Sequence, residues 1–398
     1  MTRPRLLILA STYPARPGDG IPAFVRDLAL QEAEAFEVRV VAPRVPGGAL
    51  AEEDGPLTVR RFRYFPRRWE SLAHGAILDN LRARPARSLQ LPGLVIAEWW
   101  AVRRELRRFR PDLIHAHWIL PQGLVARYAA RTIPTLVTTL GGDLYALNFW
   151  PARSIKRGVL RRAGAVTVMN EDMRERAITL GASPERTLVM PMGADLADVA
   201  AVAATRQAGR IPVILMVGRL VQKKGVAVLL DALALLPPGI PWRAVVVGDG
   251  PERKTLEARA AGLPVTFLGQ LGRGDLLRAY SEADLAVFPS IRAASGDQDG
   301  LPVALIEAMG AGLAIIASEL PGLTETVQTA GAGIIVPSGD AAALSAAIAS
   351  LLADSEERKR LGLAASYAAA AWGIDRVGEG YRALLLSLLK PGRPVQER

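Results

Sequence analysis

The hydrophobic positions of the chain form short runs of strand length, and segments with helical periodicity separate most of these runs. In the first half, the pattern predicts strands at 5–11, 37–42, 57–61, 112–116, 134–139, 165–168 and 186–190. The helices predicted there lie at 21–35, 92–109, 121–131, 154–163 and 170–180. Because strands that alternate with helices build parallel sheets from βαβ units, we expect an α/β domain in this half.

The same alternation starts again in the second half of the chain. It predicts strands at 212–217, 243–247, 265–268, 284–288, 313–317 and 333–336. The helices predicted there lie at 225–236, 252–261, 274–282, 302–311, 340–353 and 356–371. A last helix, at about 375–390, cannot be assigned to either half by its pattern alone.

A break separates the two halves, since Pro191-Met192-Gly193-Ala194-Asp195 interrupts the alternation and small residues follow to about Gly209. The length of 398 residues also favours two domains. The sequence therefore predicts an α/β fold of two Rossmann-like, doubly wound domains that face each other across a cleft, with ligands at the carboxyl ends of the strands. The domains are placed at 1–205 and 206–374. Residues 375–398 are expected to contain a C-terminal helix, with packing against the first domain as one option.

Composition excludes several classes of protein. Half of the residues are hydrophobic and 22% are charged, which excludes a disordered chain. The absence of cysteine excludes disulfide scaffolds, thiolate zinc sites and cysteine nucleophiles, and makes the cytoplasm the expected compartment. No apolar run reaches the roughly 18 residues that span a bilayer, and Leu6–Ala10 is expected to be a first strand rather than a signal peptide.

The net charge of +10 is concentrated in one segment of the chain. Residues 60–110 contain 13 arginines and only four acidic residues, whereas residues 201–398 are almost neutral, with 20 basic and 19 acidic residues. A basic cluster of this kind attracts either nucleic acid or an anionic membrane surface.

A turn with two cations follows the first strand of the second half. Gly218-Arg219-Leu220-Val221-Gln222-Lys223-Lys224-Gly225 comes directly after the apolar run Val213–Val217. Arg219 and Lys224, five positions apart, can bind the two phosphates of one diphosphate, and the amino terminus of the next helix adds its dipole. The alternative is an ordinary solvated turn, and position alone does not decide between the two.

Two carboxylates lie near the end of a later strand. Asp299 falls in the loop before Pro302, and Glu307 falls one to two turns into the following helix. Glu307 can accept hydrogen bonds from ribose hydroxyls and Asp299 can reach a sugar, while the alternative makes them a surface charge and a turn former. The helix around Glu307 is too apolar to be a solvated face, which favours a satisfied polar role. Asp297-Gln298-Asp299 also spells an Asp-x-Asp metal motif, but this short pattern is weak, and we expect no metal there.

Weaker signals lie at other predicted strand ends. Gly18-Asp19-Gly20-Ile21-Pro22-Ala23 fits a dinucleotide fingerprint poorly, although its backbone can approach a phosphate. Val247-Gly248-Asp249-Gly250-Pro251 is a glycine turn expected to serve packing or base contact. His115 and His117 point to the same side of a strand, where a role in the cleft and a structural role are equally open. A third metal ligand for them is not evident, and no Ser-His-Asp order favours a hydrolase.

Together these residues resemble the retaining glycosyltransferases of family 4, which have the two-domain GT-B architecture. The motifs that carry the resemblance are Gly218-Arg219-Leu220 with Lys224-Gly225, Val247–Pro251, Asp299 with Glu307-Ala308-Met309, the Gly18–Gly20 loop, His115-Ala116-His117-Trp118 and Gly141-Gly142-Asp143. The resemblance covers nearly the whole chain, and Gly296–Val303 is similar to the exopolysaccharide branch of the family.

The resemblance implies a role for each motif. Arg219 and Lys224 would bind the donor diphosphate and neutralise the leaving group, Glu307 would hold the ribose, and Asp299 would hold the donor sugar. Donor binding would also involve Gly18, Gly20, Gly248, Gly300 and Leu301, and His117 and Asp143 are candidates for the acceptor or the cleft. No cofactor or metal would be needed, and transfer would retain the anomeric configuration because the departing phosphate accepts the proton of the acceptor.

The chain departs from the family pattern at two positions. Many relatives have glutamate where this chain has Asp299, and the usual histidine before the Gly-Gly-Asp segment is replaced by Leu140. The function predicted is transfer of a hexose-type sugar from a UDP- or GDP-linked donor to a glycan or lipid-linked acceptor, in cell-surface polysaccharide or glycolipid synthesis. The alternatives are a sugar-nucleotide-binding protein that has lost catalysis, motivated by Leu140, a basic nucleic-acid-binding protein, and a hexose epimerase.

The arginine-rich segment favours a membrane over nucleic acid, because it offers no convincing aromatic platform or recognition helix. Residues 60–69 interleave arginines with aromatic residues. In the later helix, Trp99, Val102, Leu106 and Phe109 are predicted to form one apolar stripe, with Arg103, Arg104, Arg107, Arg108 and Trp100 on the other side. We therefore expect a peripheral protein on the cytoplasmic face of the cell membrane that binds anionic lipid through residues 60–110 and does not bind nucleic acid.

Overall fold

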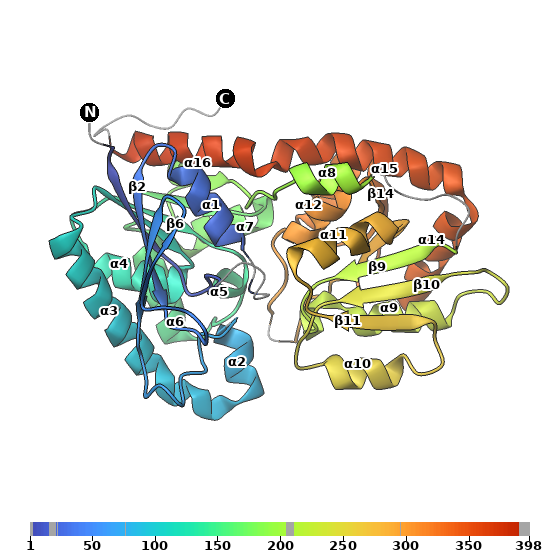
Figure 1. Ribbon diagram of the computed structural model, residues 1–398, viewed down its shortest axis with the longest axis horizontal. Helices are drawn as coiled ribbons and strands as arrows, with labels where there is room; N and C mark the ends of the chain where they lie inside the picture. The colour runs from blue at the N-terminus through green and yellow to red at the C-terminus, as the bar shows by residue number, and fades with distance from the viewer. Residues whose placement is uncertain are drawn as a thin grey trace. The chain divides into compact units, whose positions relative to one another are not determined.

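The computed structural model describes residues 3–15, 21, 23–75, 77–203, 211–294 and 296–389 (Figure 1). The chain divides into two compact units, of which the first combines residues 1–192 with 374–398 and the second is formed by residues 193–373. The boundary predicted between residues 205 and 206 lies outside the described residues. Within the described part of the chain, no helix is both long enough and apolar enough to cross a membrane.

The first unit is built on an eight-stranded sheet with the order β3-β4-β2-β1-β5-β6-β7-β8. Only β3 runs antiparallel to its neighbour among the pairs of this sheet. The strands are β1 (Arg5–Leu9), β2 (Glu37–Pro43), β3 (Ala51–Asp54), β4 (Leu57–Phe62), β5 (Leu113–His117), β6 (Thr135–Thr138), β7 (Ala165–Val168) and β8 (Thr187–Val189). The central strand β1 is apolar and fully buried from Leu6 to Leu9, because helices cover both faces of the sheet.

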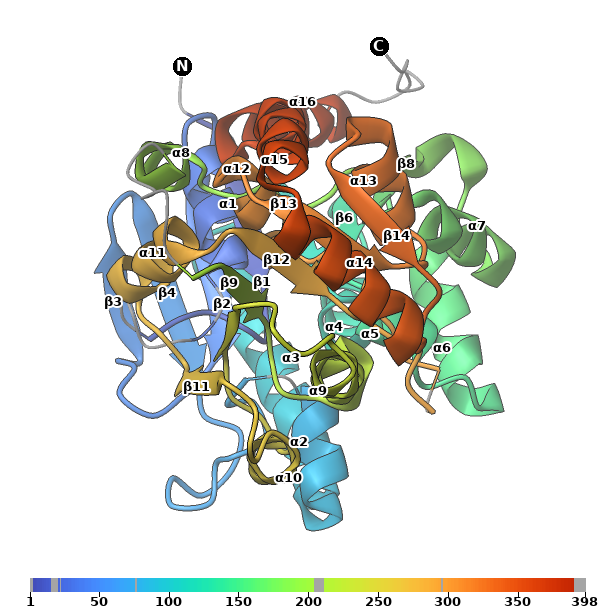
Figure 2. The same ribbon diagram turned by 90° about the vertical axis from the view of Figure 1, so that its right-hand side faces the viewer.

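The helices of the first unit include the last described helix of the chain. They are α1 (Phe24–Glu32), α2 (Ile77–Ala83), α3 (Leu91–Arg108), α4 (Leu124–Ala129), α5 (Gly142–Tyr145), α6 (Trp150–Leu160), α7 (Glu171–Leu180) and α16 (Ile374–Leu388). The short segments η1 (Pro85–Gln90), η2 (Ile119–Gly123) and η3 (Pro184–Arg186) also belong to this unit. α16 packs against α1 (Figures 1 and 2), and the hydroxyl of its buried Tyr381 donates to the carbonyl of Met190 at 2.8 Å.

The second unit contains a six-stranded parallel sheet with the order β11-β10-β9-β12-β13-β14 (Figure 2). Its strands are β9 (Val213–Val217), β10 (Arg243–Val247), β11 (Val265–Gly269), β12 (Leu285–Phe288), β13 (Ala314–Ser318) and β14 (Gly333–Val336). Side chains alternate along β9: Val213 and Leu215 belong to one buried cluster, and Ile214 and Met216 belong to another. This alternation places an apolar core on each face of the sheet.

The helices of the second unit cover both cores. They are α8 (Ala197–Ala203), α9 (Val226–Ala234), α10 (Arg253–Arg259), α11 (Arg273–Glu282), α12 (Val303–Gly310), α13 (Leu323–Ala330), α14 (Ala341–Ala353) and α15 (Ser355–Ala369), with single turns η4 (Gln222–Lys224) and η5 (Ala370–Trp372). The chain enters and leaves this unit side by side, since Ala194 pairs with Gly373 and donates from its amide to the carbonyl of Trp372 at 3.0 Å.

The predicted α/β fold with two parallel-sheet domains is confirmed, and every predicted strand is present. The pattern missed five elements: β3, α2, α5, α8 and α13. β3 has the polar sequence Ala-Glu-Glu-Asp and lies at the edge of its sheet, so it has no apolar alternation to detect. α6 begins at Trp150, four residues before the predicted start at 154.

Candidate functional site

In the second unit, glycines allow three strand ends to approach one another closely. Gly248 follows β10 with φ +133°, and a Cβ there would collide with the carbonyl oxygen of Gly218 after β9. Gly225 has φ +63°, and a Cβ there would collide with the carbonyl oxygen of Pro289 after β12. Only glycine combines these backbone angles with this proximity. The turn that contains Arg219 and Lys224 is thereby held beside the loop that contains Asp299.

Lys224 and Asp299, which are 75 positions apart in the sequence, form an ion pair in this arrangement. The Lys224 Nζ atom lies 2.7 Å from Asp299 Oδ2, and the Ser290 hydroxyl donates to the same oxygen at 3.1 Å. Burial alone would raise the pKa of Asp299, but the charges of Lys224 and the neighbouring Lys223, with these hydrogen bonds, hold it below its usual value. Asp299 is therefore an ionised carboxylate with only 8% of its surface exposed.

Several other residues proposed for donor binding lie in the same turn or loop as this pair, and two lie outside the described part. Arg219 is partly exposed in the same turn, and Gly300 and Leu301 directly precede α12. Gly18 and Gly20 lie outside the described residues.

Glu307 is buried in α12 and has two protein partners. The Arg273 guanidinium lies 2.5 Å from its Oε1 atom, and the Tyr280 hydroxyl donates to Oε2 at 3.0 Å. Burial raises the pKa of Glu307, although Arg273 and Tyr280 oppose that rise. Arg273 also donates to the backbone carbonyl of Asp195 at 2.8 Å. Glu307 therefore does not lie on a solvated face of α12. Each of its carboxylate oxygens can still accept a further hydrogen bond.

Sequence reasoning missed four residues that contact the predicted carboxylates: Lys223, Arg273, Tyr280 and Ser290. Lys223 stands in the glycine turn and could have been noticed beside Lys224. Arg273 is the first residue of α11 and Tyr280 belongs to the same helix, and nothing in the local sequence distinguishes them from ordinary helix residues.

In the first unit, Asp143 connects two strand-end turns. Its carboxylate accepts hydrogen bonds from the amide of Ile119 at 2.7 Å, the hydroxyl of Thr139 at 2.8 Å and the amide of Leu140 at 3.3 Å. Asp143 is 5% exposed, and its buried carboxylate connects the turns after β5 and β6 by hydrogen bonds. The buried amine of Lys156 supports the same segment by donating to the carbonyls of Leu144 and Ala146.

His115 and His117 point to the same side of β5, with ring centroids 4.1 Å apart, and both are fully buried. The His115 ring lies 2.7 Å from both Glu32 Oε1 and Thr138 Oγ1. Burial lowers the pKa of His115 to about 3 and that of His117 well below its usual value, so both rings are neutral. Neither ring nitrogen of His117 has a hydrogen-bond partner among the described residues.

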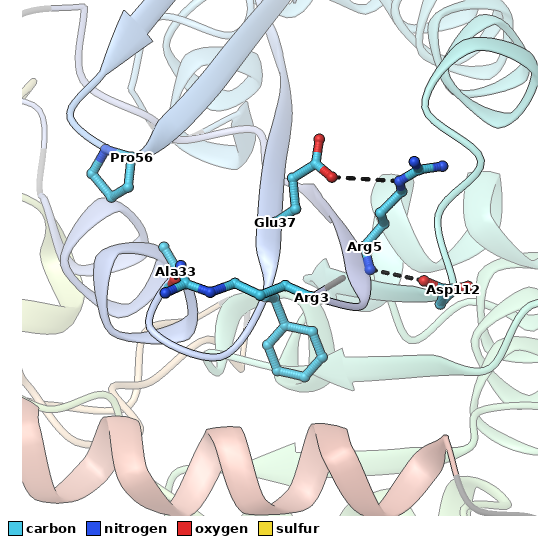
Figure 3. A pocket seen from close by; sticks show the side chains of 7 residues that line it. Arg3, Arg5, Ala33, Glu37, Pro56 and Asp112 are labelled. Carbon is cyan, nitrogen blue, oxygen red and sulfur yellow. Dashed lines mark hydrogen bonds and ion pairs between the residues drawn. The ribbon is translucent and has the colours of Figure 1, made fainter. Parts of the chain in front are cut away.

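A cavity of about 620 Å³ lies in the first unit at the amino ends of β1 and β2, and so at the opposite end of these strands from their carboxyl ends (Figure 3). Its charged groups already have partners: Arg5 lies 3.4 Å from Glu37, and the Arg5 amide donates to Asp112 at 2.8 Å (Figure 3). Because ligands of open parallel sheets bind at the carboxyl ends of the strands, this cavity is not the candidate site. The described part of the chain also contains no group of three or more acidic, histidine or cysteine side chains that could hold a metal ion.

Two glycosyltransferase domains match the chain in succession. Residues 19–193 match the glycosyl transferase 4-like domain, and residues 203–366 match the domain described as glycosyl transferases group 1.

Curated relatives of the chain are also glycosyltransferases. The chain is 36% identical over 138 residues to the amylovoran biosynthesis glycosyltransferase AmsK of Erwinia amylovora, a match that covers 33% of this chain and only 34% of that protein. It is 31% identical over 395 residues to the GDP-mannose-dependent alpha-(1-6)-phosphatidylinositol monomannoside mannosyltransferase of Mycobacterium tuberculosis, covering 93% of this chain and 95% of that protein.

Among solved structures, the sucrose-phosphate synthase from Thermosynechococcus elongatus superimposes with a TM-score of 0.79 at 23% identity, over 97% of this chain and 99% of that chain. This likeness shows the fold. The two matching domains and the relative aligned over nearly its whole length show that the chain belongs to glycosyltransferase family 4, and the solved structure shows the GT-B fold.

Proposed function

We propose that the chain is a retaining glycosyltransferase that transfers a hexose-type sugar from a UDP- or GDP-linked donor to a glycan or lipid-linked acceptor in cell-surface polysaccharide or glycolipid synthesis. The observation that carries the proposal is the ion pair between the partly exposed Lys224 and the buried Asp299, held at the strand ends by Gly225 and Gly248. The names of the relatives support a nucleotide sugar as donor and a polysaccharide or glycolipid as product.

In the proposed mechanism, Arg219 and Lys224 bind the donor diphosphate. The Lys224 ammonium has three protons, so its contact with Asp299 leaves donors for phosphate oxygens. Asp299, held ionised, accepts hydrogen bonds from hydroxyls of the donor sugar, and Glu307 accepts them from the ribose. The bond between the anomeric carbon and the phosphate oxygen breaks, and the acceptor oxygen bonds to that carbon on the same face. Its proton passes to the departing phosphate, whose developing charge the two cations stabilise.

A second candidate function is a sugar-nucleotide-binding protein that has lost catalysis, and Leu140 favours it. The Leu140 side chain is apolar, and only its backbone amide contacts Asp143. A leucine cannot supply the hydrogen bond or the charge of the usual histidine. Donor binding without hydrolysis or transfer would identify this alternative.

The experiment begins with donor binding. A nucleotide sugar at 100 times its dissociation constant adds about 2.7 kcal/mol to the free energy of unfolding, so thermal shifts with UDP- and GDP-linked sugars reveal the donor. Lys224→Ala should then lower kcat/KM by on the order of 10²-fold, because it removes charge stabilisation from the transition state. The matched control is Lys254→Ala, at an exposed lysine of α10 in the same unit. Unimpaired turnover by the Lys224→Ala protein would contradict the assignment of the diphosphate site.

We further propose that the first unit binds the cytoplasmic face of the cell membrane through arginines and exposed aromatic residues. On α3, the exposed side chains include Ile96, Trp100, Arg104, Arg107 and Arg108, and Trp69 lies exposed in the preceding segment. Cationic side chains bind anionic headgroups, and tryptophan favours the interface.

The structure corrects two details of the predicted surface. Arg61 is buried and forms an ion pair with Glu52 at 2.9 Å, so it belongs to the interior. The buried stripe of α3 contains Glu98 and Glu105 together with Val102, whereas the predicted Trp99 and Leu106 are only partly buried.

The basic surface also extends beyond residues 60–110. α4 packs between α3 and α6, and the segments 119–133 and 149–163 contain no acidic residue. The exposed arginines and aromatic residues on these segments are Tyr128, Arg131, Phe149, Trp150, Arg153, Arg157, Arg161 and Arg162. We call the exposed arginines and aromatic residues of α3, α4, α6 and the turns that follow α4 and α6 the basic face.

A further inference from the structure

Lys223, beside the proposed diphosphate-binding lysine, contacts both carboxylates of the Asp297-Gln298-Asp299 segment. Its Nζ atom lies 3.3 Å from Asp297 Oδ1 and 3.6 Å from Asp299 Oδ1. Asp297 is 3% exposed and Asp299 is 8% exposed, so both charges are shielded from solvent. The ammonium ion therefore lies between two buried carboxylates that belong to one loop.

Backbone hydrogen bonds attach the same loop to the same turn. The amide of Ile291 donates to the carbonyl of Lys223 at 2.9 Å, and the amide of Ala294 donates to the side chain of Gln222 at 3.3 Å. Inside the loop, the amide of Ala293 donates to the carbonyl of Asp297 at 2.9 Å. The position of the acidic segment thus depends on η4. Within this turn, the Lys223 side chain contacts both Asp297 and Asp299, whereas Lys224 contacts Asp299.

The charges explain why a second lysine is needed. Two buried carboxylates this close in sequence disfavour each other's ionisation. With Lys224 alone, one ammonium ion would face two carboxylates and would have little remaining attraction for a diphosphate. With Lys223 present, the charges of the two lysines and the two aspartates balance. Lys224 lies 2.7 Å from Asp299 Oδ2, and Lys223 lies 3.6 Å from Asp299 Oδ1. An Asp-x-Asp pair that binds a divalent cation receives the same neutralisation from the metal.

We propose that Lys223 is a positioning residue that neutralises Asp297 and Asp299 from within the protein, orders their loop, and leaves Lys224 available to the donor diphosphate. This inference rests on the proposed function, because it assigns Lys224 and Asp299 to the donor. It assigns a task to Asp297, which touches no part of the donor in the proposed mechanism.

The test compares Lys223→Met with Lys223→Arg, with the double variant Lys223→Met/Asp297→Asn, and with the control Lys254→Met on α10. Affinity for UDP-glucose and GDP-mannose, and for UDP and GDP, is measured by calorimetry. Lys223→Met should lower affinity for the nucleotide sugar that binds the wild-type protein by about tenfold or more, because the site gains one uncompensated negative charge. Lys223→Arg keeps the charge, and the double variant restores the balance, so both should recover most of the affinity.

A pH profile separates charge from mere support of the loop. Asp299 faces Lys224, Lys223, Asp297 and Ser290. The charges of the two lysines hold the pKa of Asp299 down, so removing the Lys223 charge in Lys223→Met should raise that pKa. The acid limb of kcat/KM should then move to higher pH. In Lys223→Met/Asp297→Asn the limb should return towards that of the wild type.

The possible results divide clearly. The inference is wrong if Lys223→Met has the same affinity and pH profile as Lys254→Met. It is also wrong if Lys223→Met folds but the added Asp297→Asn substitution does not restore its affinity. If Lys223→Met does not fold, the double variant and Lys223→Arg decide, since both must bind the donor. A wild-type protein that binds none of the four nucleotides would instead refute the proposed function itself.

Discussion

At the scale of single residues, the two carboxylates of the candidate site should respond differently to neutralisation. Glu307→Gln should weaken binding of both the nucleoside diphosphate and the nucleotide sugar, because the ribose is common to both ligands. Asp299→Asn should spare the nucleoside diphosphate and weaken only the nucleotide sugar, by roughly tenfold for a lost hydrogen bond to a charged acceptor. Calorimetric titration of both variants with both ligands measures the difference.

The matched control for these variants is Glu282→Gln, at an exposed glutamate of α11 that is paired with Arg243. It should leave both affinities unchanged. Equal losses for both ligands in Glu307→Gln and in Asp299→Asn would show that the proposed division between ribose and sugar is wrong.

Metal removal tests the same site from another direction. Since Lys223 and Lys224 supply positive charge at Asp297 and Asp299, we expect treatment with EDTA to leave transfer activity intact. Activity is compared before and after dialysis against the chelator, and again after addition of Mn²⁺ or Mg²⁺. Strict dependence on either ion would identify the two aspartates as metal ligands and contradict the proposal.

The main residues of this site could be predicted from the sequence, but the side chains that contact them could not be predicted. Glycines and cations at strand ends, with the family resemblance, point to Lys224, Asp299 and Glu307. Arg273 contacts Glu307 from a helix that begins 34 positions earlier, and no local pattern predicts which polar side chain crosses such a distance. Asp143 shows the same limit, because its three donors come from two different turns.

At the scale of elements, strands were predicted better than short helices. The central strands are apolar because both of their faces are covered, and such runs stand out in any sequence. α13 buries only Leu323, Thr326 and Val327, and α5 has a single turn. Elements with so few apolar positions have no period that a pattern can detect.

The buried stripe of α3 gives a prediction about stability. Glu98 is fully buried with only a 3.5 Å contact from Gln122, and burial raises its pKa to about 8. Between pH 4.5 and 8 the folded protein therefore holds a proton at Glu98 that the unfolded chain releases, so stability falls as pH rises through this window. Glu98→Gln removes this loss and should raise the free energy of unfolding by on the order of 1–3 kcal/mol at pH 8.

Denaturant unfolding at pH 5 and pH 8 checks this expectation, with little difference from the wild type at the lower pH. Glu105→Gln on the same stripe provides the contrast. Glu105 pairs with Arg39 at 2.6 Å, so its neutralisation should lower stability by roughly 1–3 kcal/mol. Identical pH dependence in Glu98→Gln and the wild type would contradict the assigned protonation of Glu98.

At the scale of the whole molecule, positive charge is concentrated on one unit. At about 1 kcal/mol per basic residue near an anionic surface, a few arginines of the basic face suffice for reversible binding. We therefore expect the protein to sediment with anionic but not with neutral vesicles, and salt to release it. Replacing Arg104, Arg107 and Arg108 by glutamine should weaken sedimentation. Arg103 is left in place because it donates to the carbonyl of Ala129.

A charge-matched control replaces three exposed cations of the second unit, Lys254, Arg278 and Lys359, by glutamine. This variant has the same net charge as the α3 variant and should bind vesicles like the wild type. Equal loss of binding in both variants would mean that net charge, and not the basic face, attracts the protein to lipid. Equal sedimentation with neutral vesicles at low salt would contradict a role for the arginines.

The return of α16 to the first unit has a consequence for how the protein is made. α16 closes over α1, and Tyr381 supplies the hydrogen bond that the carbonyl of Met190 accepts. Residues 193–373 must be translated between Met190 and α16, which at 5–20 residues per second takes on the order of ten to forty seconds. During that interval, Gln31 of α1 and the carbonyl of Met190 lack their partners on α16, which are Asp375, Arg382 and Tyr381, while the second unit can already fold. The unit whose synthesis begins first is therefore completed last.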